Sequence, residues 1–166
     1  MRVERGFMTL EVGHAGGYRL HQTVVLVGMM GSGKTAIGKA LSQALNVPFR
    51  DSDDEIVAAA QQSIAEIFTR DGEAFFRMRE TEVISRLLTM TPGVLSTGGG
   101  AFLRGENREA IDADGVSVWL DAPLGLLWER VRGKDTRPLL RTENPKATLT
   151  EIYNCLLYTS PSPRDS

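Results

Sequence analysis

A glycine-rich loop between an apolar run and an amphipathic stretch constrains this chain more than any other feature. Residues 28–35 read Gly-Met-Met-Gly-Ser-Gly-Lys-Thr, which matches the G-x-x-x-x-G-K-[ST] pattern of phosphate-binding loops. The preceding residues 23–27 are apolar and mostly β-branched, as expected of a buried parallel strand. Residues 34–45 carry Ile37, Leu41 and Leu45 at a spacing of four, which predicts an amphipathic helix that ends at Asn46.

This loop predicts nucleotide binding. Glycines let successive backbone N–H groups converge on phosphate oxygens, and the positive end of the following helix points at the same place. We expect the segment Gly31, Ser32 and Gly33 to cradle the phosphates of ATP, Lys34 to bridge the β- and γ-phosphates, and the Thr35 hydroxyl to bind Mg²⁺. The loop alone does not separate a kinase from a GTPase, a motor or a regulatory nucleotide binder.

The rest of the chain alternates between predicted strands and helices. Residues 48–51, 93–97 and 116–120 read as short strands. Helices are predicted from a capping box at residues 63–66, across a pattern that carries Phe75, Met78, Val83 and Leu87, over residues 124–131, and from a second capping box at residues 148–151. Asp71-Gly72 is expected to interrupt the helical pattern. The alternation predicts an α/β fold with a doubly wound parallel sheet.

Length and composition limit the remaining possibilities. With 166 residues the chain has room for one domain, and a net charge of −2 gives no general attraction to nucleic acid or to a membrane surface. No apolar run approaches the roughly 18 residues that span a bilayer. The single cysteine, Cys155, fits a reducing cytoplasm. We expect a cytoplasmic monomer, and we assign no role to His14 and His21.

Charged residues and glycines that could bind a ligand lie after the predicted strands and on the helical pattern between them. Asp51 and Asp53, two residues apart at a strand end, are expected to project to one side, although such a sequence taken alone is more typical of a helix cap. Arg77 has Glu80 within helical reach, as an orienting partner or as an ordinary surface pair. Gly98, Gly99 and Gly100 would let backbone amides approach a small ligand, or form a flexible turn.

These separated motifs, in this order over residues 23–154, resemble the shikimate kinases. The resemblance implies a P-loop three-layer αβα fold of the nucleoside-monophosphate-kinase-like type with a lid, and transfer of the γ-phosphate of ATP to the 3-hydroxyl of shikimate on the route to chorismate and aromatic amino acids. It implies no partner beyond shikimate and ATP. The catalytic residues that it implies are Lys34, Asp53 and Arg137.

The same resemblance distributes the other roles. It assigns Asp51 to the magnesium side of the site, Asp53 to the acceptor hydroxyls, and Arg77 to the acceptor carboxylate. Gly98, Gly99 and Gly100 lie against shikimate, and Phe68 and Phe76 line its pocket, although aromatic residues at this spacing are also typical of a core. Arg137, in a lid at residues 135–140, closes over the phosphoryl group. Arg130 lies beside adenine or on a solvated helix face. The choice of catalytic base stays open.

The two ends of the chain are expected to lie outside this domain. Residues 1–22 contain four glycines and show no periodicity, which predicts a flexible N-terminal extension. Residues 155–165 read as the translation of a transposase sequencing adapter, so we expect the genuine kinase sequence of residues 23–154 to stop there and residues 155–166 to be a non-native tail. The family would continue with a second carboxylate-binding arginine and an adenine contact, and we therefore expect impaired activity.

Two other functions fit part of the sequence. Another small-metabolite P-loop kinase, such as a gluconate kinase, would share the phosphate loop but not the combination of Asp51, Asp53, Arg77 and the three glycines. A nucleotide-binding module without catalytic activity would need the loop alone.

Overall fold

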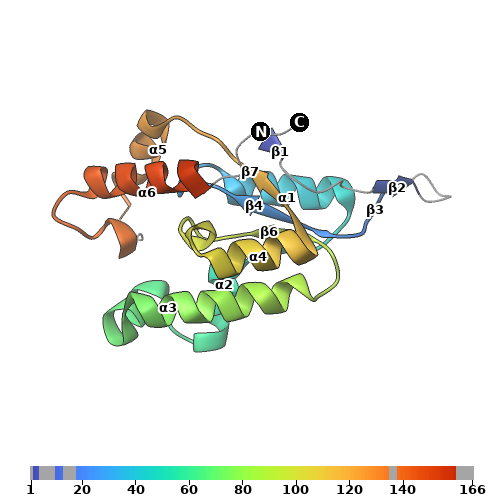
Figure 1. The fold of residues 1–166 in the computed structure, drawn as a ribbon, viewed down its shortest axis with the longest axis horizontal. Coiled ribbons are helices and arrows are strands. Elements are labelled where there is room, and N and C mark those ends of the chain that lie inside the picture. The colour runs from blue at the N-terminus through green and yellow to red at the C-terminus, as the bar shows by residue number, and fades with distance from the viewer. Residues whose placement is uncertain (1, 4–9, 13–17, 135–137, 160–166) are drawn as a thin grey trace.

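The computed structural model describes residues 2–3, 10–12, 18–134 and 138–159, and a five-stranded sheet lies at its centre (Figure 1). The strands follow the order β1-β7-β4-β6-β5 and comprise β1 (Arg2–Val3), β7 (Gly115–Trp119), β4 (Thr23–Val27), β6 (Val94–Ser96) and β5 (Phe49–Asp51). The last four run parallel, which confirms the predicted α/β fold. Strand β1 pairs antiparallel with β7, and β2 (Leu10–Val12) and β3 (Tyr18–Leu20) form a separate antiparallel pair.

These three N-terminal strands lie in the segment for which the sequence predicts no regular structure. The domain boundary after residue 22 stays a prediction.

Helices connect the strands and cover both faces of the sheet (Figure 1). They comprise α1 (Lys34–Leu45), α2 (Ser52–Ala60), α3 (Ile64–Leu88), α4 (Gly105–Asp114), α5 (Leu124–Val131) and α6 (Pro145–Thr159), with short 3-10 turns η1 (Ala101–Leu103) and η2 (Pro138–Leu140). Helices α1 and α5 have the bounds that the sequence predicts.

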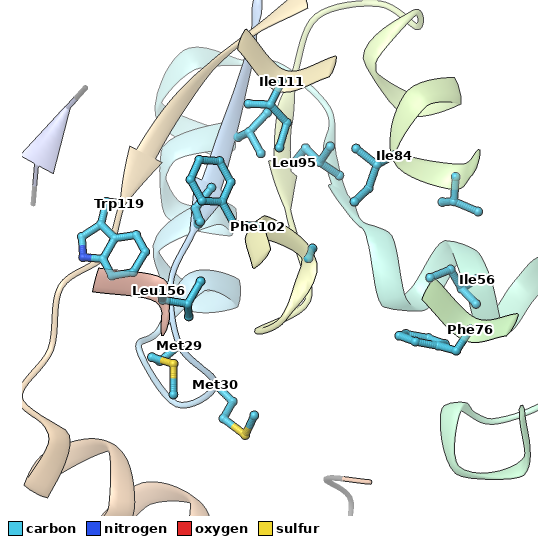
Figure 2. Close-up of a cluster of buried hydrophobic side chains, with 14 of the residues drawn as sticks. Met29, Met30, Ile56, Phe76, Ile84, Leu95, Phe102, Ile111, Trp119 and Leu156 are labelled. Carbon is cyan, nitrogen blue, oxygen red and sulfur yellow. The ribbon is translucent and has the colours of Figure 1, made fainter. Parts of the chain in front are cut away.

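Alternation along the strands divides the core into two parts. Successive side chains of a strand point to opposite faces of a sheet. Val25 and Leu95 contribute to one cluster, in which helices α3, α4 and α6 also bury apolar residues. Figure 2 shows part of it, with Leu95 among Ile84 of α3 and Ile111 of α4. Val24, Leu26 and Val94 belong to the second cluster, against which α1 and β5 pack.

The face that α1 buries differs from the one that its apolar spacing indicates. Ile37 is 39% exposed, and the buried residues of this helix are Lys34, Gly38 and Ser42. A Cβ atom at Gly38 would lie 2.5 Å from the ring of Phe49, so the absent side chain lets strand β5 approach the helix closely. The predicted helix is correct, and the prediction that Ile37 belongs to its apolar face is wrong.

Helix α3 begins and bends where the sequence predicts. Ser63 Oγ accepts a hydrogen bond from the Glu66 amide, and Glu66 Oε2 accepts one from the Ser63 amide, which together form the predicted capping box. Gly72 has φ 84° and ψ 170°, so it interrupts the helical backbone and divides α3 into two parts. The predicted break is confirmed as a kink at Gly72.

Helix α6 begins earlier than the capping box at residues 148–151 predicts. Pro145 is its first residue, and the side-chain oxygen of Asn144 accepts a hydrogen bond from the Ala147 amide. Proline fits the first helical position because its missing N–H would have no partner there. The helix continues to Thr159, and Leu156 is buried in the same cluster as Met29 and Trp119 (Figure 2). The proposed division of the chain after Asn154 stays a prediction.

Candidate active site

The loop between β4 and α1 has the conformation that its glycines allow. Gly33 has φ 95°, a left-handed conformation that side chains disfavour, and it directly precedes the helix. Lys34 is only 9% exposed, and its Nζ donates hydrogen bonds to the carbonyls of Gly28 and Met29, each at 2.8 Å. The lysine therefore lies inside the loop and presents its charge there.

Arg130 of α5 contacts this loop. Its Nη1 donates a hydrogen bond to the Gly31 carbonyl at 2.7 Å. The side chain therefore contacts the phosphate loop, although the residue is exposed, and its assignment to adenine stays a prediction. It also lines the same hollow as Lys34 and Thr35.

That hollow, of about 510 Å³, joins most of the residues expected to bind nucleotide and metal. Its lining comprises Met30, Gly31, Gly33, Lys34, Thr35, Ala36, Asp51, Asp53, Ser96, Thr97, Gly98, Gly99, Arg130 and Lys134. Asp51 also caps α2, because its Oδ1 accepts hydrogen bonds from the amides of Asp53 and Asp54 at 2.9 and 3.3 Å. Burial raises the pKa of the Asp51 carboxyl, and the Asp54 amide opposes that rise. Asp51 thus caps α2 and also lines the hollow, and its assignment to magnesium stays a prediction.

A smaller hollow of about 80 Å³ adjoins the first one and gathers the residues expected to bind the acceptor. It is lined by Met30, Asp53, Ile64, Phe68, Phe76, Arg77, Glu80, Gly98, Gly99, Gly100 and Leu139. Phe68 and Phe76 have ring centroids 4.8 Å apart, and Phe76 is also part of the hydrophobic core. Both interpretations of the aromatic pair, pocket and core, therefore apply to Phe76.

Arg77 is fixed by contacts on three sides. Its Nη1 donates a hydrogen bond to Glu80 Oε1 at 2.7 Å, and its guanidinium carbon lies 5.3 Å from the ring centroid of Phe76. A Cβ atom at Gly100 would come within 2.5 Å of Arg77 Nη2, so only glycine lets the guanidinium occupy this position. With 12% of its side chain exposed, Arg77 is not an ordinary surface ion pair.

Glu80 is an unusual partner because it is completely buried. Among the described residues its second oxygen, Oε2, has no hydrogen-bond partner. Burial raises the pKa of the Glu80 carboxyl above its ordinary value of 4.5, and the charge of Arg77 opposes that rise. The fold therefore keeps a costly charged group next to Arg77, which indicates a role in orienting the guanidinium.

This burial predicts a pH-dependent effect of Glu80→Gln on stability. The raised folded-state pKa means that the stability contributed by protonated Glu80 is fully present below about pH 4.5 and is lost as the pH rises through the folded-state pKa. Glutamine cannot ionise, so the variant does not lose this stability as the pH rises. The difference in melting temperature, variant minus native chain, should therefore increase from pH 4 to pH 7. Each 1 kcal/mol corresponds to about 2–4 °C for a chain of this size.

Thermal melts of both chains across this pH range test the prediction, with Glu82→Gln as the control for removing one acidic group from an exposed position of the same helix. A difference that stays constant or decreases with pH would contradict it.

Arg137, which the resemblance places in the lid, lies outside the described residues. A further hollow of about 470 Å³ between α2 and α3 shares no lining residue with the two hollows above. Within the residues that the structure describes, no group of three or more His, Cys, Asp or Glu side chains could hold a metal ion. None of the described helices combines the length and apolar character that a membrane-spanning segment requires.

Comparison with known proteins agrees with the geometry. Residues 30–163 match the family model described as shikimate kinase. The chain belongs to the shikimate kinase family. The shikimate kinase of Ruegeria pomeroyi is 66% identical over 138 residues, or 83% of this chain and 71% of that relative. The one from Cereibacter sphaeroides is 64% identical over 134 residues, or 81% and 67% of the two chains.

Among solved structures, a shikimate kinase from Acinetobacter baumannii in complex with shikimate matches with a TM-score of 0.80 and 38% identity, over 83% of this chain and 77% of that chain. The P-loop kinase fold expected for a shikimate kinase is thereby confirmed.

Several residues of this shikimate kinase site were missed by sequence reasoning. Met30, Ile64 and Leu139 line the smaller hollow, and nothing in their spacing distinguishes them from core residues. Ser52, between the two aspartates, is completely buried, and its Oγ accepts a hydrogen bond from the Gly98 amide at 3.3 Å. The only available signal for Ser52 was its position inside the Asp-x-Asp element.

Proposed function

We propose that this chain transfers the γ-phosphate of ATP to the 3-hydroxyl of shikimate, giving shikimate 3-phosphate and ADP. One observation carries the proposal. The hollow that contains Lys34 and Thr35 and the hollow that contains Arg77 share Met30, Asp53, Gly98 and Gly99 as a common wall. A phosphate donor on one side and a small acceptor on the other would therefore meet across a few atoms, as phosphoryl transfer requires.

Lys34 provides the main fixed charge on the donor side. Phosphoryl transfer passes through a loose transition state with charge spread over three oxygens, so catalysis consists mainly of positioning and electrostatic stabilisation. The buried Nζ of Lys34 is already held by two loop carbonyls and needs little rearrangement to contact phosphate oxygens. Arg130 stands beside the same loop, where it would contact the nucleotide. We propose that Arg137 adds a further cation as the lid closes and excludes water.

Arg77 and Asp53 orient the acceptor. A planar guanidinium matches a carboxylate through two parallel hydrogen bonds, so Arg77 fixes the ring acid by its carboxylate. Asp53, which lines both hollows, is positioned to accept a hydrogen bond from the reacting hydroxyl. In the transfer, the hydroxyl oxygen forms a bond to the γ-phosphorus while the bond to the bridging oxygen of ADP breaks, and the hydroxyl proton leaves to Asp53 or to water.

The residues present also fit a magnesium ion. Thr35 and Asp51 line the phosphate-side hollow together, and this small number of protein oxygens suits Mg²⁺, which prefers waters and substrate phosphates for its remaining ligands. The ion would neutralise charge on the β- and γ-phosphates. We propose that this monomeric chain acts in the cytoplasm, in keeping with its one cysteine and its small-molecule substrates.

Measurement of ADP release with shikimate, with gluconate and without an acceptor tests this function. We expect ADP release that depends on shikimate and saturates with it, and no turnover above background with gluconate. Faster turnover with gluconate would instead identify a kinase for sugar acids. Binding of a nonhydrolysable ATP analogue without turnover on either acceptor would identify a nucleotide-binding module that lacks catalytic activity.

A further inference from the structure

Three consecutive glycines, Gly98–Gly100, line the smaller hollow, and the first two of them also belong to the wall that it shares with the larger one. Glycine has no side chain that could anchor it in the core, and its backbone is the most flexible of all residues. Yet Gly100 must hold a defined position, because Arg77 Nη2 lies only 2.5 Å from the place where a Cβ atom of residue 100 would be. The position of the glycine segment must therefore be imposed by neighbouring residues.

The upstream end of the segment is anchored from the sheet and from α2. Thr97 Oγ1 donates a hydrogen bond to the Leu26 carbonyl of β4 at 3.0 Å. The Gly98 amide donates one to the buried Ser52 Oγ at 3.3 Å. These contacts fix Gly98, but they do not reach Gly100.

The downstream end is tied to the turn η1. The Ala101 amide donates a hydrogen bond to the Gly98 carbonyl at 3.1 Å, and the Leu103 amide donates one to the Gly100 carbonyl at 3.2 Å. Any displacement of η1 therefore moves Gly100. Ala101 and Phe102 are buried. Because apolar packing is non-directional, it does not by itself fix the orientation of the turn.

Two adjacent side chains of α4 hold the three carbonyls of η1. Asn107 Nδ2 donates a hydrogen bond to the Ala101 carbonyl at 2.8 Å, and Arg108 Nη1 donates to the carbonyls of Phe102 and Leu103 at 2.8 and 2.9 Å. Asn107 is completely buried, and its Oδ1 has no hydrogen-bond partner among the described residues. A buried amide with one unsatisfied oxygen is costly, which argues against a role in packing alone.

We propose that Asn107 and Arg108 are positioning residues for the acceptor. They brace η1, η1 fixes Gly100, and Gly100 fixes the place where the Arg77 guanidinium meets the acceptor carboxylate. This inference rests on the proposed function, and it assigns to α4 a role in acceptor affinity although neither residue lines either hollow. Gly100 lines only the acceptor hollow, so the brace acts on the acceptor more than on the nucleotide.

Kinetics of three variants test whether the hydrogen bonds from Asn107 and Arg108 to η1 position the acceptor site. We expect Asn107→Ala and Arg108→Met each to raise the KM for shikimate about tenfold, with the KM for ATP changed by less than about twofold. Arg108→Lys should recover most of the affinity, because an ammonium group can also donate to two carbonyls. Amide hydrogen exchange at residues 98–103 should become faster in the first two variants.

Ile111→Val is the matched control, since Ile111 is a completely buried residue of the same helix whose aliphatic side chain cannot hydrogen-bond to η1. It should lower the melting temperature and leave the KM for shikimate unchanged. The proposal is overturned if both KM values rise together, or if the KM for shikimate rises as much in the control. Absence of shikimate turnover in the native chain would refute the proposed function, whereas the hydrogen-exchange comparison would still test the brace.

Discussion

Replacement of Lys34 by methionine is expected to lower kcat/KM by about 10²–10³-fold, the usual effect of losing one fixed charge that stabilises a transition state. Methionine keeps much of the apolar stem that Lys34 buries in the loop but removes the ammonium group that donates to the carbonyls of Gly28 and Met29. The loss should appear mainly in kcat, because the charge on the phosphoryl oxygens matters most during transfer. Steady-state kinetics with ATP and shikimate measure it.

Lys39→Met controls for this change, because Lys39 is an exposed lysine on the same helix and lines neither hollow. Its kinetics should match those of the native chain within about twofold. If Lys34→Met kept more than about a tenth of native kcat/KM, the phosphate-side hollow would not be the donor site.

Arg77→Ala should raise the KM for shikimate by about 10²–10³-fold and leave the affinity for an ATP analogue unchanged. The variant loses the carboxylate-binding fork and leaves Glu80 buried without its partner, a combination that costs about 2–5 kcal/mol in comparable charge pairs. Arg77→Lys keeps the charge but not the planar pair of donors, so its KM for shikimate should lie between the values of the native chain and of Arg77→Ala. Titration of each variant with the nucleotide analogue and acceptor kinetics give the two affinities separately.

Arg79→Ala is the control, since Arg79 lies two residues away on the same helix, is half-exposed and pairs with Glu82 outside the acceptor hollow. It should change neither affinity. An equal loss of nucleotide and acceptor affinity in Arg77→Ala would contradict the assigned role and would indicate general loss of structure, which a melting curve detects.

Local chemistry explains which parts of the fold were predictable. The bounds of α1 follow from the phosphate loop before it and from Asn46 after it, which adopts the expected left-handed conformation with φ 52°. The start of α3 follows from its capping box, and its interruption from Gly72. In each case one or two residues impose the backbone geometry, whatever they pack against.

Features that depend on distant contacts were less accessible. The buried side of α1 is decided by Phe49, which packs where Gly38 lacks a side chain, and no spacing within the helix contains that information. Strand β1 needs a partner more than one hundred residues away, with Arg2 opposite Trp119. The sequence predicts the start of α6 at the capping box of residues 148–151, whereas in the structure the helix starts at Pro145 and the side chain of Asn144 caps it.

The same distinction applies to the site. Motifs identified Lys34, Asp53, Arg77 and the three glycines, and the structure brings all of these around two adjoining hollows. The buried state of Glu80 and the contacts of Ser52 and Asn107 arise from tertiary packing, which a pattern of letters does not encode.

The wall common to both hollows limits how substitutions can alter the substrate preference of this enzyme. In the proposed arrangement, a substitution at Met30, Asp53, Gly98 or Gly99 alters the surroundings of donor and acceptor at once, so the preference for one of them cannot be adjusted there alone. Coupling between two binding sites is reciprocal. The factor by which bound acceptor changes the nucleotide affinity therefore equals the factor by which bound nucleotide changes the acceptor affinity. In the same arrangement, a change of preference toward another ring acid would have to come from residues that line the acceptor hollow alone, such as Phe68 and Phe76.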